Sequence, residues 1–234
     1  MARIALSYSR ISDYRQCPHK FRLKYIDKVP NFQLKDEDKS PALVRGGNIH
    51  KDLERYVTMK REGVVYEPTL PEVIGATPLI DMLYANYNLY PERQIAIDEN
   101  FKEVSWYDKN AYFRVIYDLV GFGNDLFLGD YKTGKMTDYS GSMSELGQLH
   151  MSAVVGMSLW SEYSECSTVY IYVDHKKTIP VKFKQESLDP MKEKLQIEHD
   201  IINCDVNFME KRNQYCKWCE ATKDQCIHSK KDKS

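Results

Sequence analysis

The strongest constraint on the fold is the segment 118–132, which places three charged side chains in two short apolar runs joined by a turn. Asp118 lies in the first run, the turn Gly-Phe-Gly-Asn-Asp follows at 121–125, and Asp130 and Lys132 lie in the second run. Side chains two residues apart leave the same face of a strand, so Asp130 and Lys132 point the same way. A hairpin at 121–125 predicts that all three charges converge, which is costly unless a metal ion or a phosphate lies among them.

Such a centre carries the groups needed to hydrolyse a phosphodiester bond. Mg²⁺ and Mn²⁺ prefer oxygen ligands, activate water and neutralise phosphate charge. Asp118 and Asp130 are the predicted ligands, and the backbone carbonyl of Tyr131 is near enough in sequence to add an oxygen. Lys132 would position or deprotonate the water, or stabilise the developing negative charge. A salt-bridge ladder on the surface of a hairpin is the alternative interpretation.

Periodicity along the rest of the chain predicts an α/β (α+β) fold with a central mixed β-sheet flanked by helices. A polar loop is expected at 31–42 and a Pro- and Gly-punctuated stretch at 63–78. Helices are predicted from Ser7 or Ser9, from Pro18, from about Gly46, and at about 78–90, 143–162 and 187–203; strands are predicted at about 94–105, 111–120, 125–132, 168–174 and 179–184.

One histidine lies on a helix face that is expected to point inward. His50, Leu53, Glu54 and Val57 follow the spacing of residues that share one side of a helix. A histidine in such a position is usually a hydrogen-bonded core residue, so periodicity alone does not make it a metal ligand.

The charge distribution is uneven although the formal net charge is only −1. Residues 1–35 hold eight lysines and arginines against two aspartates. This basic segment can steer a phosphate chain, or it can be a solvated helix face.

No apolar run reaches the ~18–20 residues that span a bilayer, and the start is too polar for a signal peptide. We therefore expect a cytoplasmic protein, in the host cytoplasm if it is viral, without membrane contact.

Three of the six cysteines are clustered as Cys216, Cys219 and Cys226. A reducing compartment argues against a disulfide framework, and a closed thiolate site needs a fourth ligand. Cys166 and Cys204 are isolated, and we expect both to be buried as small hydrophobic residues.

The segment around Asp130 resembles the PD-(D/E)xK nuclease signature in its RecB-type form. It reads Gly-Asp-Tyr-Lys-Thr-Gly at 129–134, after Ile-Tyr-Asp-Leu-Val at 116–120. The resemblance continues in family order from residue 6 to residue 226. It includes Leu-Ser-Tyr-Ser at 6–9, Tyr-Arg-Gln-Cys-Pro at 14–18, Gly-Gly-Asn-Ile-His at 46–50 and Gln-Leu at 148–149.

This resemblance implies a restriction-endonuclease-like core at about 44–185 within a single nuclease domain at 1–234. It makes His50 a metal ligand, adds Gln148 to the catalytic residues, and leaves Glu99 either as a supporting acid or as an exposed residue. The chain departs from the family pattern at Arg114–Tyr117, where a glycine is usual, and at Ser152, where a tyrosine is usual.

The resemblance also supplies a fourth cysteine. AddB-type and CRISPR-associated RecB-like nucleases hold a [4Fe–4S] cluster with one N-terminal and three C-terminal cysteines, which implies that Cys17 joins the other three. The cluster would tie the helical segments 1–30 and 204–228 together, and 229–234 would be a disordered tail. Structural Zn²⁺ is the alternative, because spacing does not distinguish the two.

The expected function is therefore that of a metal-dependent DNA nuclease, a single-stranded DNA exonuclease in repair, recombination or processing. A structure-specific endonuclease and a non-catalytic DNA-binding module of the same fold are the alternatives. The chain has no nucleotide-binding G-x-x-x-x-G-K-[ST] loop, so unwinding would need a helicase, or a recombination or CRISPR partner. The predicted DNA contacts are Tyr8, Arg10, Tyr14 and Arg15.

Overall fold

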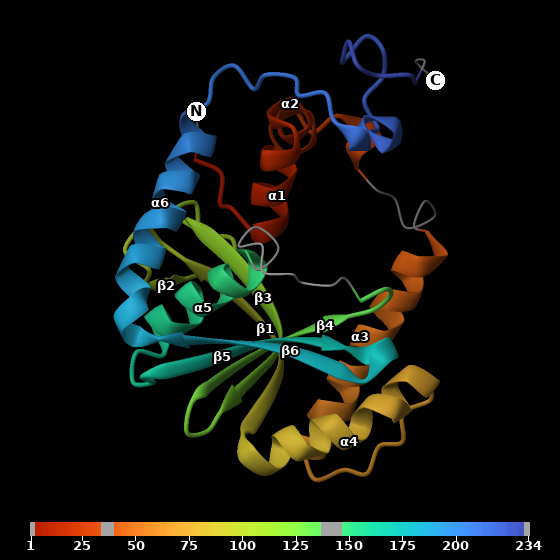
Figure 1. The fold of residues 1–234 in the computed structure, drawn as a ribbon, viewed down its shortest axis with the longest axis vertical. Coiled ribbons are helices and arrows are strands. Elements are labelled where there is room, and N and C mark those ends of the chain that lie inside the picture. Colours follow the sequence, from red (N-terminus) through yellow and green to blue (C-terminus); the bar gives the residue numbers. More distant parts are fainter. Residues whose placement is uncertain (1–2, 34–39, 137–146, 232–234) are drawn as a thin grey trace. The chain divides into compact units, whose positions relative to one another are not determined.

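The computed structural model describes residues 3–33, 40–136 and 147–231 (Figure 1). The chain divides into two compact units. One, the sheet unit, comprises Met1–Ala5 and Pro41–Ile197, and the other, the cysteine unit, comprises Leu6–Ser40 and Glu198–Ser234. The predicted single nuclease domain stays a prediction.

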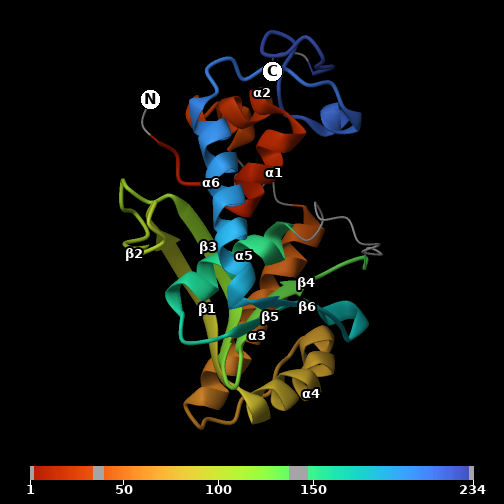
Figure 2. The same ribbon diagram turned by 60° about the vertical axis from the view of Figure 1, so that its left-hand side comes forward.

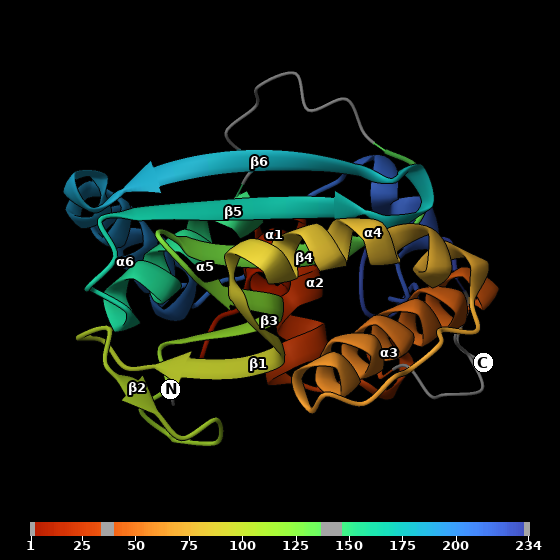
Figure 3. The same cartoon turned by 90° about the horizontal axis from the view of Figure 1, so that it is seen from below.

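A mixed β-sheet forms the centre of the sheet unit. Among the described residues its strand order is β2-β1-β3-β4-β5-β6. The β4–β5 pair is parallel and the other neighbouring pairs are antiparallel; Figure 3 shows β5 and β6 side by side. The strands are β1 (Asn88–Ile97), β2 (Glu103–Val104), β3 (Phe113–Phe122), β4 (Leu126–Lys132), β5 (Glu165–Tyr172) and β6 (Lys177–Lys184).

Helices pack against this sheet. Apolar residues of α3 (Pro41–Arg61) and α4 (Pro71–Asn86) form a core with Phe127 of β4 and Ile171 of β5. Helix α5 (Gly147–Leu159) lies on the crossover that the parallel β4–β5 pair requires, and its residue Leu149 packs against Tyr170 of β5. The predicted α/β fold with a central mixed sheet and flanking helices is confirmed.

Two predicted boundaries were wrong because of local turn chemistry. Helix α4 begins at Pro71, where proline fits the first helical turn, and it continues through Pro78. The predicted strand at 94–105 is interrupted, because the Asp98 carboxylate accepts the amides of Asn100 and Lys102, both at 2.9 Å, and closes a turn between β1 and β2.

Helix α3 also differs from the prediction, since it begins at Pro41 and includes both Gly46 and Gly47. A Cβ atom at Gly46 would lie 2.9 Å from Oγ1 of Thr133, whereas at Gly47 it would meet nothing within 4 Å. Glycine at 46 therefore allows the helix to approach the residue that follows Lys132.

The other two predicted helices can be compared in part. The first residues of the predicted helix at 143–162 lie outside the described residues, and α6 (Leu188–Cys204) matches its prediction closely.

The cysteine unit is built from short helices (Figure 2). Helix α1 (Tyr8–Gln16) is capped by Ser7, whose hydroxyl accepts the Arg10 amide, and α2 (Pro18–Phe21) starts at Pro18, as predicted. Between them Cys17 is extended, at φ −162° and ψ 109°. The chain continues from α2 into a π-helical turn at Arg22–Ile26, and later forms the 3-10 helix η6 (Gln214–Trp218).

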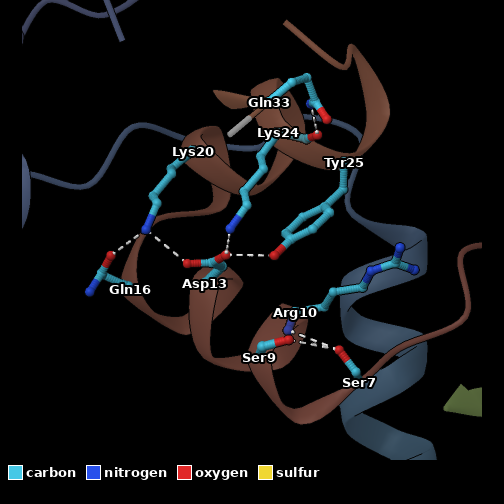
Figure 4. Close-up of polar contacts among 9 residues, drawn as sticks. All are labelled: Ser7, Ser9, Arg10, Asp13, Gln16, Lys20, Lys24, Tyr25 and Gln33. Atoms are coloured by element: carbon cyan, nitrogen blue, oxygen red, sulfur yellow. Dashed lines mark hydrogen bonds and ion pairs between the residues drawn. The ribbon is translucent and has the colours of Figure 1, made fainter. Parts of the chain in front are cut away.

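A single carboxylate ties α1 to the helical segment after Cys17 (Figure 4). Asp13 accepts hydrogen bonds from Lys20 Nζ at 2.8 Å, Lys24 Nζ at 2.9 Å and the Tyr25 hydroxyl at 2.7 Å. Burial raises the pKa of Asp13, but the three hydrogen bonds outweigh it and the pKa is lowered overall. The bend that carries Cys17 is thus fixed from both sides.

The predicted disordered tail at 229–234 stays a prediction, and its first residues form hydrogen bonds. The Ser229 hydroxyl donates to the Ala221 carbonyl at 2.5 Å, and the Lys223 amide donates to the Lys231 carbonyl at 2.8 Å. Residues 232–234 lie outside the described residues. No helix in the described part of the chain is long and apolar enough to cross a membrane.

Candidate active site

The two aspartates of the opening motif lie where the β3–β4 ladder ends. Leu119 pairs with Gly129, and Asp118 and Asp130 are the next residues along the two strands. There the Asp118 carboxylate accepts the Tyr131 amide at 2.7 Å. The side chain of Asp118 therefore binds the backbone of β4 beside Asp130, which holds the two strand ends together.

Asp130, Lys132 and Gln148 form a closed set of polar contacts. Lys132 Nζ lies 2.6 Å from Asp130 Oδ2 and donates to Gln148 Oε1 at 3.0 Å. Gln148 Nε2 donates to Asp130 Oδ1 at 2.5 Å. The structure thus brings Gln148, from the start of α5, to the two charged residues of β4.

His50 reaches the same region from α3. Its Nδ1 lies 3.2 Å from Asp118 Oδ1, and its ring meets the buried ring of Tyr131 edge-on at 5.7 Å between centroids. Burial lowers the pKa of His50, but the hydrogen bond to Asp118 and the charges of both aspartates raise it more, so it is raised overall.

The pKa of Asp130 depends on its charged neighbours. Burial raises the pKa of Asp130; the Lys132 ammonium lowers it and the charge of Asp118 raises it, and the net direction is upward. The raised pKa values of His50 and Asp130 thus reflect charges on the same small group of residues, which includes Asp118 and Lys132.

The sequence matches the model of the PD-(D/E)XK nuclease superfamily over residues 5–226. The chain belongs to this superfamily. No curated protein matches it. Among solved structures, one described as "Crystal structure of SSO0001" is similar, with 14% identity and a TM-score of 0.47, covering 92% of this chain and 82% of that one. The RecB-type form remains a prediction.

The donor atoms of this PD-(D/E)XK site fit a hard divalent cation. Asp118 and Asp130 offer carboxylate oxygens and His50 an imidazole nitrogen, a combination that suits Mg²⁺ or Mn²⁺. Asp130 Oδ2 is buried and lacks a hydrogen bond within the described residues, although the Lys132 ammonium is close. Among the described residues, no three His, Cys, Asp or Glu side chains form a group that could hold a metal ion. The Tyr131 carbonyl stays a predicted ligand.

Two features of the PD-(D/E)XK site were not predicted. Tyr170 of β5 is paired with Asp130, and its buried ring lies 4.8 Å from the Lys132 ammonium. Asp174 accepts the Gly134 amide at 2.7 Å and two hydrogen bonds from Arg45 at 2.6 and 3.2 Å, which anchors the segment after Lys132 to α3. In the sequence, Tyr170 lies in an apolar run and Asp174 in the turn after it. Only the parallel β4–β5 pairing brings the two residues to the active site.

Glu99 lies in the turn after β1 and not on a strand. Its carboxylate is exposed and pairs with Arg3 at 2.7 Å. Of the two predicted alternatives, the structure therefore shows an exposed residue.

Three of the predicted DNA contacts have partners inside the cysteine unit. The Tyr14 hydroxyl donates to Asp205 at 2.7 Å; burial and this bond raise its pKa to about 12. Arg15 donates twice to Glu198, at 2.5 and 2.7 Å, and the Arg10 guanidinium lies 5.0 Å from the centre of the Tyr25 ring. Tyr8 is half-buried on α1. A DNA-binding role for these four residues stays a prediction.

The cysteines implied by the resemblance share one pocket of about 210 Å³ within the cysteine unit. Burial raises the pKa of Cys226, as do the nearby Glu210 carboxylate and the thiols of Cys17 and Cys219. The sulfur of Cys216 accepts the Asn213 amide at 3.3 Å. The pocket is lined by Cys17, Cys216, Cys219 and Cys226, by His19, Lys20, Lys211 and His228, and by Gln16, Leu23, Asn213, Tyr215, Trp218, Ala221 and Ser229.

The two remaining cysteines differ from each other. Cys166 is buried, as predicted, whereas Cys204 is exposed. The prediction for Cys204 was wrong because this residue ends α6 on a solvent-facing side.

Proposed function

We propose that this chain is a metal-dependent deoxyribonuclease that degrades single-stranded DNA from an end. The observation that carries the proposal is the contact set of Asp130, Lys132 and Gln148 beside the Asp118–His50 pair. A preference for single strands and free ends follows from the resemblance to RecB-type exonucleases, as do a role in repair, recombination or processing and a helicase or CRISPR partner.

Asp118, Asp130 and His50 would hold Mg²⁺ or Mn²⁺, which supplies charge neutralisation and an acidified water when bound. Lys132 would orient that water or offset negative charge on the phosphate, since its ammonium already points into the carboxylate site. Gln148 would keep both groups in place, because one amide contacts Asp130 and Lys132 at once.

Mutation of the two charged residues of β4 tests this proposal. Asp130→Ala and Lys132→Ala should each reduce Mn²⁺-dependent degradation of end-labelled single-stranded DNA by at least about 100-fold, the usual effect of removing a group that stabilises the transition state. Lys177→Ala, at an exposed position of β6, is the control.

The alternatives give different results on the same gels. Cleavage of closed circular single strands would indicate an endonuclease. If the wild-type chain binds DNA but cleaves none with Mg²⁺ or Mn²⁺, it is a binding module and the enzyme proposal is wrong.

We also propose that the four pocket cysteines hold a [4Fe–4S] cluster. The resemblance supports this proposal, because one N-terminal and three C-terminal cysteines hold such a cluster in that family, and all four cysteines line the same pocket here. Structural zinc is the alternative, since both groups take thiolate ligands. The cluster would stabilise the cysteine unit and take no part in hydrolysis.

Anaerobic purification distinguishes the two cofactors. A brown protein with iron, sulfide and absorbance near ~400 nm would support the cluster. A colourless protein with one zinc ion per chain would replace it by the structural zinc alternative.

A further inference from the structure

Two large aromatic side chains of the cysteine unit remain at the surface. Tyr215 is 47% exposed and Trp218 is 62% exposed, both on the short helix η6. Their ring centroids are 6.2 Å apart and the ring planes are inclined at 41°. Exposed tryptophan is uncommon, because its burial stabilises a fold more than that of most residues. Both side chains also line the cysteine pocket, and a large part of each is open to solvent.

The backbone under these rings is well fixed. Asn213 caps η6, because its side-chain oxygen accepts the Tyr215 amide at 2.8 Å. The side-chain nitrogen of Asn213 donates to the Gln16 carbonyl at 3.0 Å and to the Lys211 carbonyl at 2.9 Å. These bonds hold η6 to the end of α1, so the rings are presented without much loss of conformational freedom on binding.

The charge of the same segment is uniformly positive. Residues 211–218 include Lys211, Arg212 and Lys217 and contain no acidic residue. All three cationic side chains are exposed, and Lys217 Nζ lies 3.9 Å from the centre of the Trp218 ring. Positive charge beside flat aromatic surfaces complements a chain that alternates phosphates and bases.

We infer that Tyr215, Trp218 and Lys217 form a stacking platform for single-stranded DNA. The inference rests on the proposed nuclease function, because it names a surface that holds the strand. It also moves the expected strand contact away from Tyr14 and Arg15, whose side chains bind within the cysteine unit. A stacked base loses its aromatic partner when Trp218 is removed and loses a phosphate contact when Lys217 is removed.

Binding of a fluorescein-labelled oligothymidylate to the intact, cofactor-loaded chain tests the platform. The assay is run without Mg²⁺ or Mn²⁺ so that cleavage is prevented while the cysteine-bound cofactor is kept. Trp218→Leu should weaken Kd by roughly 5- to 100-fold, the effect of removing one stacking partner, whereas Trp218→Phe should keep most of the affinity. Tyr107→Leu, at an 87% exposed aromatic position of the sheet unit, should leave Kd unchanged.

Two further readouts separate stacking from damage to the neighbouring cysteines. Lys217→Ala should reduce the slope of log Kd against log salt concentration by about 0.7, the value for one phosphate contact on a single strand. Trp218→Phe should also abolish a DNA-dependent quench of tryptophan fluorescence. Iron or zinc content and circular dichroism are measured for each variant, and only variants that match wild type in both are compared.

The platform is overturned if Trp218→Leu and wild type bind the oligonucleotide equally, or if wild type does not bind it. Its failure is distinct from failure of the nuclease proposal. Cleavage by wild type with unchanged Kd in Trp218→Leu would remove the platform alone. Weakened binding in Trp218→Leu by a chain that never cleaves DNA would remove the nuclease function alone.

Discussion

The candidate active site and the cysteine pocket both bring reactive side chains together, but they arrange them in opposite ways. In the sheet unit, Asp130, Lys132 and Gln148 satisfy one another directly. In the cysteine unit, Cys17 and the three later cysteines surround a hollow. The first site joins its polar groups to one another and leaves only Asp130 Oδ2 of the carboxylate without a hydrogen bond among the described residues, whereas the second arranges its cysteines around a pocket.

The secondary structure that supports the two sites also differs. The active-site residues stand on hydrogen-bonded strands and on two long helices, and a continuous apolar core supports them. The pocket cysteines stand on a bend, a short 3-10 helix and the turns after it. A region with fewer buried contacts generally has a lower local stability. Loss of a bound metal ion should therefore abolish the activity of the sheet unit, whereas loss of the cysteine-bound cofactor should unfold the cysteine unit.

The largest expected effect is the loss of one pocket cysteine. Cys226→Ser should lose most of the bound iron or zinc and lower the stability of the cysteine unit by several kcal/mol, because binding of such a cofactor is coupled to folding. Limited proteolysis should then cut within 6–40 and 198–234 before 41–197. Equal protease resistance of the two units in this variant would contradict the comparison.

The Asp13 network should give the next largest effect. Asp13→Asn leaves Lys20 and Lys24 without their carboxylate and should cost about 1–3 kcal/mol in the free energy of unfolding. The lowered pKa of Asp13 means that this stabilisation is present above the unfolded pKa near 3.9 and is lost as pH falls through the folded pKa.

Urea unfolding across a pH series checks this prediction. The difference between wild type and Asp13→Asn should be full at pH 7 and should narrow below about pH 4. A difference that stays constant with pH would show that the ionised carboxylate is not responsible. Asp27→Asn, in the exposed pair with Arg22, is the control and should cost less than about 1 kcal/mol.

Tyr170 tests whether the active site depends on its buried support. Tyr170→Leu removes the aromatic ring beside the Lys132 ammonium and should lower kcat by about 2- to 30-fold, the range for a cation–π contact, with less change in KM. Tyr170→Phe keeps the ring and should stay close to wild type. A similar loss of kcat in both variants would assign the effect to the hydroxyl group instead.

The smallest effect comes from the paired glycines of α3. Gly47→Ala should raise the free energy of unfolding by up to about 1 kcal/mol, because alanine is the better helix former and open space surrounds the position. Gly46→Ala brings the same benefit but places a Cβ atom 2.9 Å from Thr133. Thermal unfolding should show Gly46→Ala as the less stable variant; the reverse order would contradict the close approach.

Local pattern was enough to predict much of the sheet unit. The Asp118–Lys132 hairpin, the helix of His50 and the mixed sheet follow from alternation, turn residues and family resemblance. The position of Tyr170 depends on parallel pairing across a crossover, which periodicity does not encode. Tyr14 and Arg15 pair with Asp205 and Glu198, which lie far along the sequence, so these two pairings were not predictable from residues 1–35.

The cysteine unit joins two stretches of chain that leave the ribosome far apart in time. Asp13 and its three partners all lie before residue 26, so the bend that carries Cys17 can form early in synthesis. Cys216 follows Cys17 by about 200 residues, a delay of roughly 10–40 s at typical elongation rates. During that interval the other three pocket cysteines have not yet been translated, so Cys17 lacks them as partners. If the four cysteines hold a cofactor as proposed, its loading is therefore a late step of biogenesis, after the sheet unit has been translated.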